Sequence, residues 1–251
     1  IRDPELSRGL GMCIRDRDYS IGINDKLDQK IKIGIPSDYL KDVSGDILSQ
    51  IENTKKALIK HNVEFVDVEF KTTEYALSTY YILAPAEASS NLARYDGIRY
   101  GVREDGKSLD DIYLNSRTKG FGDEVTRRIL IGAYVLSAGY YDAYYRQAQK
   151  VRRLIKDDFQ RIFNDVDFIL TPTTPNEAFK IGDKLDPISM YMNDIYTVPT
   201  SLAGLPGISI PSGLSSNGLP LGIQFIGNYF EEKKLLQIAA LAEKELNFNE
   251  Q

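Results

Sequence analysis

A strand–helix–strand pattern between residues 30 and 70 constrains the fold of this chain more than any other sequence feature. Residues 30–36 (KIKIGIP) alternate in polarity and end in glycine and proline, as a strand does. Residues 45–61 repeat their apolar positions at helical spacing, and residues 63–70 mix apolar and acidic positions like a half-buried strand. This order predicts a βαβ unit with two parallel strands, and therefore an α/β fold.

The rest of the sequence predicts further helices and strands around this unit. We expect proline and glycine to shape the helices, with a kink or interruption at Pro85, bends at Gly132 and Gly139, and a stop or bend at Pro199. The predicted helices are residues 73–95, 123–164, 187–198 and 231–246, and the predicted strands are residues 167–170, 207–210 and 221–226.

Residues 1–17 (IRDPELSRGLGMCIRDR) have neither helical nor strand periodicity. We expect this segment to be an irregular lead-in that is not part of the native fold. The folded domain is therefore predicted to comprise residues 18–251.

Two residue counts exclude several classes of site. The chain has one cysteine, Cys13, and one histidine, His61, so it can form no internal disulfide and no closed Cys/His zinc site. A Ser-His-Asp triad could use only His61, which lies at a polar helix end where a solvated histidine is expected. No Gly-x-Ser-x-Gly elbow, Walker loop or His-Glu-x-x-His motif is present.

The charge and hydropathy patterns bear on partners and location. The net charge of −5 argues against a globally basic nucleic-acid binder. No apolar run approaches the roughly 20 residues that span a bilayer, and no apolar secretory segment is present. We therefore expect no membrane association and a cytoplasmic location.

Arg128 is the first candidate binding residue. Helical phase places it on one stripe with Val125, Gly132 and Val135, so it lies on the apolar face of its helix. A buried guanidinium needs a partner, because an unpaired buried charge costs several kcal/mol. That partner is either an internal carboxylate or the carboxylate of a ligand, for which the planar guanidinium is suited.

Asp194 and Tyr80 are the other candidates. Asp194 lies at the edge of an apolar stripe before Pro199, where it is either a solvated, cap-like aspartate or an anion for a ligand ammonium group. Tyr80 shares an apolar stripe with Leu77, so it is either a core residue or a pocket wall. If the three side chains converge, they can recognise the two charges of a free amino acid.

A third feature is a tyrosine-rich segment followed by basic residues. Tyr140–Tyr145 precede Arg146, Lys150 and Arg153, which share one helix face. Such interleaving either contacts RNA or forms an ordinary solvated helix face over packed tyrosines.

Several longer runs carry a family resemblance. They resemble the A subunits of the Glu-tRNA(Gln)/Asp-tRNA(Asn) amidotransferases, which belong to the amidase-signature family. The run AEASSNL at residues 86–92 is specific to these A subunits, whereas LAGLP at residues 202–206 is shared with other amidase-signature enzymes. The resembling runs are residues 80–101 (YYILAPAEASSNLARYDGIRYG), 120–129 (GFGDEVTRRI), 136–145 (LSAGYYDAYY), 186–191 (DPISMY), 202–207 (LAGLPG) and 222–227 (GIQFIG).

The resemblance implies a fold and an activity. The fold would be a mixed β-sheet covered by helices, with residues 18–251 forming the C-terminal part of the amidase domain. The enzyme would hydrolyse glutamine and pass ammonia to a B subunit, which amidates misacylated tRNA with ATP and Mg²⁺, in a heterotrimer with a C subunit. No cofactor is expected in this chain. Tyr80, Arg128 and Asp194 align with the residues that hold glutamine.

The resemblance also leaves two alternatives. In the family, the nucleophile belongs to a Ser–cis-Ser–Lys triad in a segment upstream of the matched region, and this chain lacks that segment. We therefore assign no catalytic residue and expect the chain alone to be inactive. The alternatives are another amidase-signature amide hydrolase, or a non-catalytic module that binds partner subunits.

Overall fold

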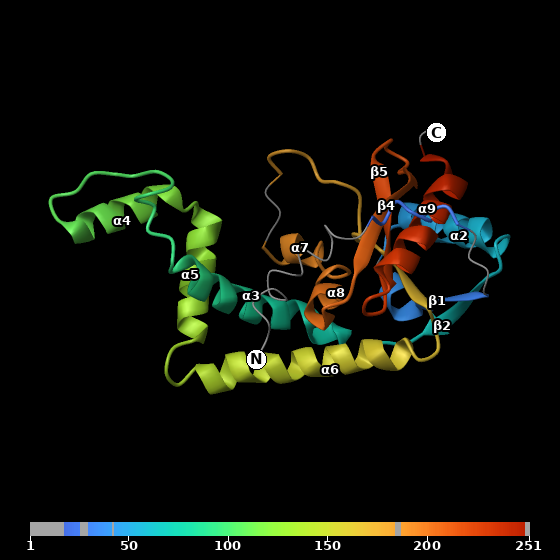
Figure 1. Cartoon of the computed structure of the whole chain (residues 1–251), viewed down its shortest axis with the longest axis horizontal. Helices are drawn as coiled ribbons and strands as arrows, with labels where there is room; N and C mark the ends of the chain where they lie inside the picture. The colour runs from blue at the N-terminus through green and yellow to red at the C-terminus, as the bar shows by residue number, and fades with distance from the viewer. Residues whose placement is uncertain (1–17, 26–29, 42, 184–186, 249–251) are drawn as a thin grey trace. The chain divides into compact units, whose positions relative to one another are not determined.

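The computed structural model describes residues 18–25, 30–41, 43–183 and 187–248, so the predicted lead-in at residues 1–17 lies outside the described residues. The chain divides into two compact units. The first, here called the sheet unit, comprises the chain up to Lys71 and from Asp158 onward, and the second, the helical unit, comprises residues 72–157. Figure 1 colours the whole chain along the sequence, from blue at the N-terminus to red at the C-terminus.

The sheet unit is built on one five-stranded sheet with the order β2-β1-β3-β5-β4. The two strands of the predicted βαβ unit are parallel, and β3 is also parallel to β1. β5 is antiparallel to both of its neighbours, β3 and β4, so the sheet is mixed, as predicted. The strands are β1 (Ile31–Pro36), β2 (Val63–Val68), β3 (Phe168–Pro172), β4 (Gly207–Leu214) and β5 (Pro220–Gly227).

One face of this sheet packs against α2 (Gly45–Ile59) and α9 (Glu232–Leu246), which lie on the same side of the sheet in Figure 1. The helices bury their apolar stripes against alternate residues of the strands, among them Leu170, Ile223 and Phe225. Burial of this apolar surface is the main source of stability for the sheet unit.

The opposite face carries a row of polar side chains. Thr171, Gln224 and Ser209 are directly paired neighbours on β3, β5 and β4, so they lie on one face of the sheet. The neighbours of Gln224 along β5 belong to the apolar core on the other face. The short helices α7 (Pro187–Met192) and α8 (Val198–Ala203) follow β3 in the chain, on the side of the sheet away from α9 in Figure 1.

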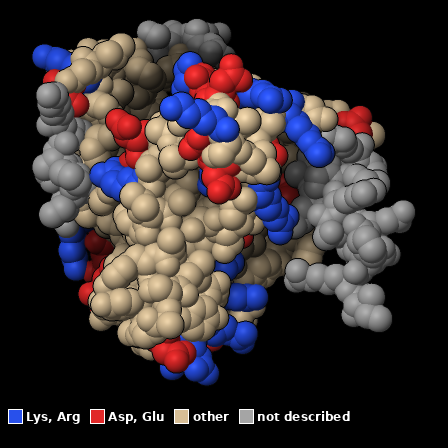
Figure 2. Space-filling view, turned by 90° about the vertical axis from the view of Figure 1, so that its left-hand side faces the viewer, with Lys and Arg blue, Asp and Glu red and all other residues tan. Residues whose placement is uncertain are grey.

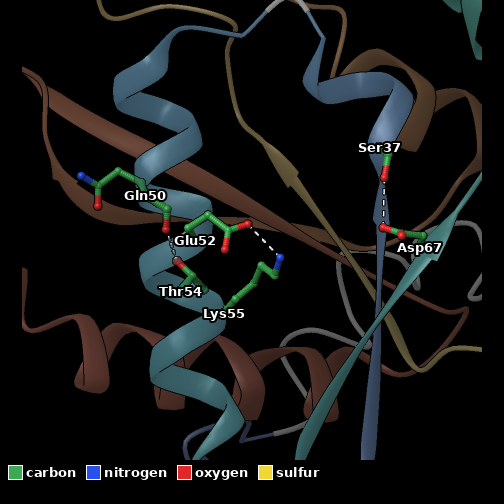
Figure 3. A network of polar contacts seen from close by, with 6 residues as sticks. All are labelled: Ser37, Gln50, Glu52, Thr54, Lys55 and Asp67. Atoms are coloured by element: carbon green, nitrogen blue, oxygen red, sulfur yellow. Dashed lines mark hydrogen bonds and ion pairs between the residues drawn. The ribbon is translucent and has the colours of Figure 1, made fainter.

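Hydrogen bonds made by polar side chains help to hold β2 and α2 in place (Figure 3). The Ser37 hydroxyl, at the start of the 3-10 turn η1 (Ser37–Leu40), donates to Asp67 Oδ1 of β2 at 3.0 Å. Within α2, the Thr54 hydroxyl donates to the Gln50 carbonyl at 2.7 Å, and Lys55 Nζ donates to Glu52 Oε1 at 2.8 Å. The first bond ties the segment after β1 to the neighbouring strand.

The helical unit consists of helices and their connections. Its core is the contact between α3 and α5, in which a side chain at Gly132 would clash, because its Cβ would lie 2.0 Å from the Pro85 carbonyl oxygen. Its elements are η2 (Thr73–Tyr75), α3 (Ala76–Leu92), α4 (Leu109–Gly120), α5 (Asp123–Val135), the π-helical turn η3 (Tyr141–Tyr145) and the first part of α6 (Arg146–Ile162).

Three helix predictions were wrong in detail. The predicted helix 123–164 is interrupted after Val135, where Gly139 adopts a φ of +91° that favours glycine. Gly132 is not a bend but a point of close helix approach. Pro199 lies in the first turn of α8 instead of ending a helix, because a first-turn proline lacks only an N–H that would be unpaired there.

Helix α4 was not predicted at all. Its start carries a reciprocal capping box, in which the Ser108 side chain accepts from the Asp111 N–H and the Asp111 side chain accepts from the Ser108 N–H. This Ser-x-x-Asp spacing was the signal available in the sequence. Among the described residues, no helix combines the length and the hydropathy needed to cross a lipid bilayer.

A buried carboxylate links α6 to the chain that leaves β2. Asp158, whose side chain is 4% exposed, accepts from the Lys71 N–H and from Arg161 Nη2, both at 2.6 Å. Arg161 Nη2 also donates to the Glu69 carbonyl at 2.6 Å. The buried Asp158 carboxylate is therefore stabilised by two donors, one from the backbone after β2 and one from a guanidinium that is itself 45% exposed.

We expect Asp158→Ala to lower the free energy of unfolding by about 2 kcal/mol, because the Lys71 N–H loses its carboxylate acceptor and Arg161 keeps only its bond to the Glu69 carbonyl. The matched control is Asp157→Ala. Asp157 pairs with Arg153 on the surface, where both side chains are about half exposed or more, and its loss should cost below about 1 kcal/mol. Urea unfolding of the two variants measures the difference, and equal losses would contradict this role for Asp158.

Candidate substrate-recognition site

The candidate site in the helical unit centres on Arg128 of α5. The predicted helical stripe is confirmed, since Gly132 and Val135 are buried and Arg127 points to solvent. The Arg128 side chain is 36% exposed, so it lies at the border of the buried face.

Arg128 has an internal carboxylate partner on its own helix. Its Nε donates to Glu124 Oε1 at 2.8 Å, and Arg127 binds the other oxygen of the same carboxylate. The hydrogen bond from Arg128, followed by that from Arg127, holds the pKa of Glu124 below its ordinary value. The hydrogen bond with Glu124 likewise raises the pKa of Arg128. Arg128 is therefore a permanent cation with an ordered guanidinium.

Tyr80 of α3 joins this cluster. A hydrogen bond with Tyr80 also raises the pKa of Arg128, although less than the bond with Glu124 does. The Tyr80 ring is half-buried and makes an edge-on contact with Tyr81, with ring centroids 5.1 Å apart. The packing of α3 on α5 thus brings together two of the three predicted site residues.

Asp194 belongs to the sheet unit, and its convergence with Tyr80 and Arg128 stays a prediction. It is half-buried and lies in a turn between α7 and α8, not in one continuous helix. Its carbonyl accepts from the Thr197 N–H at 3.2 Å and the Val198 N–H at 3.0 Å. The same turn includes Tyr196, whose buried hydroxyl donates to the Tyr39 carbonyl at 2.8 Å.

Sequence reasoning missed Glu124 as the partner of Arg128. The signal was available, because a glutamate four residues before an arginine on a helix is a standard ion-pair spacing. It also missed Gln224, a buried carboxamide that contacts the Asp194 turn from β5.

The tyrosine-rich segment has both apolar and charged surroundings. Figure 2 shows a broad uncharged area on the face turned to the viewer, and six apolar side chains of α5 and the following segment are at least 40% exposed. Arg146 pairs with Asp142 at 3.1 Å and Arg153 with Asp157 at 2.9 Å, so neighbouring carboxylates offset these cations. RNA contact by this segment stays a prediction. The six exposed side chains are Leu130, Ile131, Tyr134, Tyr140, Tyr141 and Tyr144.

His61 has an acidic partner beside a cavity. It lies just past the end of α2, and its Nε2 is 3.1 Å from Glu245 Oε1 of α9. The cavity has a volume of about 420 Å³ and is also lined by Asn24, Gln237 and Lys244. Across the described part of the chain, no group of three or more histidine, cysteine, aspartate or glutamate side chains is placed to hold a metal ion.

Comparison with known proteins identifies the family. The family model described as Amidase matches residues 13–236. The chain belongs to the amidase family. The predicted amidase-signature resemblance is therefore confirmed.

Relatives with high identity carry a more specific name. The chain is 53% identical over 236 residues to the A subunit of Glutamyl-tRNA(Gln) amidotransferase from Pelagibacter ubique, covering 92% of this chain and 48% of the relative. It is 50% identical over 232 residues to the protein of the same name from Halothermothrix orenii, with 92% and 48% covered. The chain thus spans about half the length of these relatives.

Solved structures agree with the fold. The crystal structure of the A subunit of Glutamyl-tRNA(Gln) amidotransferase from Thermotoga maritima matches with a TM-score of 0.67 and 39% identity, covering 89% of this chain and 44% of that one. A crystal structure of an amidase matches with a TM-score of 0.66 at 21% identity, covering 86% and 46%, which supports the fold alone.

The ion pair in the helical unit can be tested by titration. Because the pKa of Glu124 lies below its ordinary value of 4.5, the pair stabilises the folded chain at neutral pH, and this contribution disappears as the pH falls through the lowered pKa. Arg128→Gln should raise the pKa of Glu124 toward its ordinary value, and Arg127→Gln should raise it less. NMR titration of the Glu124 carboxyl measures both, and no rise in the Arg128 variant would contradict the pairing.

Proposed function

We propose that this chain is part of the glutamine-hydrolysing A subunit of a tRNA-dependent amidotransferase. The observation that carries the proposal is the identity of at least 50%, over most of this chain, to proteins named as the A subunit of Glutamyl-tRNA(Gln) amidotransferase. In this proposal, the enzyme releases ammonia from glutamine for the conversion of Glu-tRNA(Gln) or Asp-tRNA(Asn) to the amidated product.

The contribution of this chain is recognition of glutamine. Arg128 would bind the α-carboxylate, Asp194 the α-ammonium, and Tyr80 would line the site and orient Arg128. The bond to Glu124 uses Nε of Arg128, and the Nη end of a guanidinium offers the paired donors that a carboxylate accepts. A ligand that lacks either charge would lose one of these two charge-assisted contacts, which provides selectivity.

The remaining parts of the reaction fall to other groups. The nucleophile would come from a Ser–cis-Ser–Lys segment in the part of the relatives that this chain does not span. Ammonia would pass to the B subunit, which would bind misacylated tRNA and use ATP and Mg²⁺, with a C subunit completing the complex. An amidase for neutral amides is the weaker alternative, because such a substrate gives Arg128 and Asp194 no charges to bind.

We expect Arg128→Lys in the full-length complex to reduce kcat/KM for glutamine by roughly ten- to hundredfold, because lysine keeps the charge but loses the planar donor pair. Amidation driven by an ammonium salt should be unchanged, since free ammonia bypasses this site. Arg127→Lys is the matched control, because Arg127 shares the Glu124 carboxylate but points to solvent.

Two assays on each variant, one with glutamine and one with ammonium, separate recognition from folding. Equal losses of Arg128→Lys in both assays would mean that Arg128 supports the fold and not the substrate. A loss in Arg127→Lys as large as that in Arg128→Lys would point to the Glu124 ion pairs instead of a substrate clamp.

We also expect the 251-residue chain by itself to release no ammonia from glutamine, since an amide hydrolase needs an activated nucleophile. The measurement is ammonia release by the purified chain, with the full-length complex as the positive control. Turnover that copurifies with the chain through successive columns would contradict the placement of the nucleophile outside it.

A further inference from the structure

Gln224 is the polar side chain in β5, a strand that is buried along most of its length. β5 is flanked by β3 and β4, and Ile223, Phe225 and Ile226 around Gln224 are at most 1% exposed. Gln224 is itself only 6% exposed. A buried carboxamide costs stability unless its groups are hydrogen-bonded, so its bonding partners identify its role.

The amide nitrogen of Gln224 makes two hydrogen bonds. Nε2 donates to the Thr171 hydroxyl of β3 at 3.0 Å and to the Tyr196 carbonyl at 3.0 Å. A carbonyl can only accept, so the nitrogen end of the carboxamide must face Tyr196. Thr171 is fully buried and directly paired with Gln224 across the sheet, so it fixes the direction of the second N–H.

The carbonyl that Gln224 binds lies in the turn that carries Asp194. The Asp194 carbonyl accepts from Thr197 and Val198, which encloses Tyr196 in one hydrogen-bonded turn. The Tyr196 side chain fixes the turn at a second point, through its bond to the Tyr39 carbonyl. The turn is therefore attached to the sheet by Gln224 and to the segment after β1 by Tyr196.

We propose that Gln224 is a positioning residue for substrate recognition, which holds the Asp194 turn against the sheet so that the Asp194 carboxylate meets the ammonium group of glutamine. This inference rests on the proposed function of Asp194. A rigid support for a binding residue matters because an error of about an ångström in its position weakens binding and catalysis.

The test uses the full-length amidotransferase complex and the variant Gln224→Met, which keeps the length of the side chain and removes both donors. We expect the KM for glutamine to rise about tenfold, while ammonium-driven amidation stays within about twofold of the parent. A second variant, Thr171→Val, keeps Gln224 but removes the atom that orients it, and should raise KM in the same direction by a smaller factor. If Gln224→Met fails to fold, Thr171→Val alone tests whether Gln224 positions the turn.

The matched control is Ser212→Ala. Ser212 is a buried residue of β4 whose hydroxyl donates to the Leu221 carbonyl at 3.2 Å, so its bond lies within the β4–β5 hairpin. Its loss should lower the Tm and leave the KM for glutamine unchanged. If the KM for glutamine rises in every variant whose Tm falls, including Ser212→Ala, the effect on KM comes from lost stability, and the inference is overturned.

A double-variant cycle separates this inference from the proposed function. If Gln224 acts through Asp194, adding Gln224→Met to Asp194→Asn should cause no further loss of kcat/KM for glutamine. If Asp194→Asn impairs glutamine use and the two losses multiply, Gln224 does not act through Asp194. If Gln224→Met and Thr171→Val have no effect, Gln224 does not position the turn. In both cases the positioning role of Gln224 fails and the proposed role of Asp194 stands. If Asp194→Asn leaves glutamine use unchanged, the proposed role of Asp194 fails, and the inference fails with it.

Discussion

The sheet unit depends on covering both faces of one mixed sheet. α2 and α9 cover one face with apolar contacts, and this requires alternate residues of β3, β4 and β5 to be apolar. The other face carries the polar side chains of Thr171 and Gln224, which can remain buried because they are hydrogen-bonded to each other, and beside them Ser209 at an exposed position of β4. The same constraint that stabilises the sheet therefore connects it to the turn before α8, where Asp194 lies.

The helical unit depends on the close packing of α3 against α5. α3 and α5 approach so closely at Gly132 that no side chain fits there, which brings Tyr80 to the guanidinium of Arg128. Glu124 then orders that guanidinium from within the same helix. A packed helix pair and a local ion pair thus prepare a cation before any ligand arrives, which reduces the ordering that binding requires.

Local sequence patterns predicted several elements that depend on local physics, although the capping box of α4 and the Glu124–Arg128 spacing were missed. The βαβ unit followed from periodicity, and the phase of Arg128 followed from the stripe that ends at Val135. The break after Val135 depends on the left-handed conformation of Gly139, and the close approach at Gly132 depends on α3, so neither was visible in a helical pattern. The bonds of Gln224 reach Thr171 across 53 residues and Tyr196 across 28, which is why no short motif predicted them.

Arg128 and Asp194, from the two units, are proposed to bind opposite ends of one glutamine molecule, and the recognition roles of Arg128, Asp194 and Gln224 depend on this. A crystal structure of the full-length complex with bound glutamine, with the nucleophile inactivated, tests it most directly. We predict the α-carboxylate within hydrogen-bond distance of the Arg128 guanidinium and the α-ammonium within the same distance of the Asp194 carboxylate. Glutamine bound elsewhere, or bound while Arg128 contacts only Glu124, would contradict the proposal.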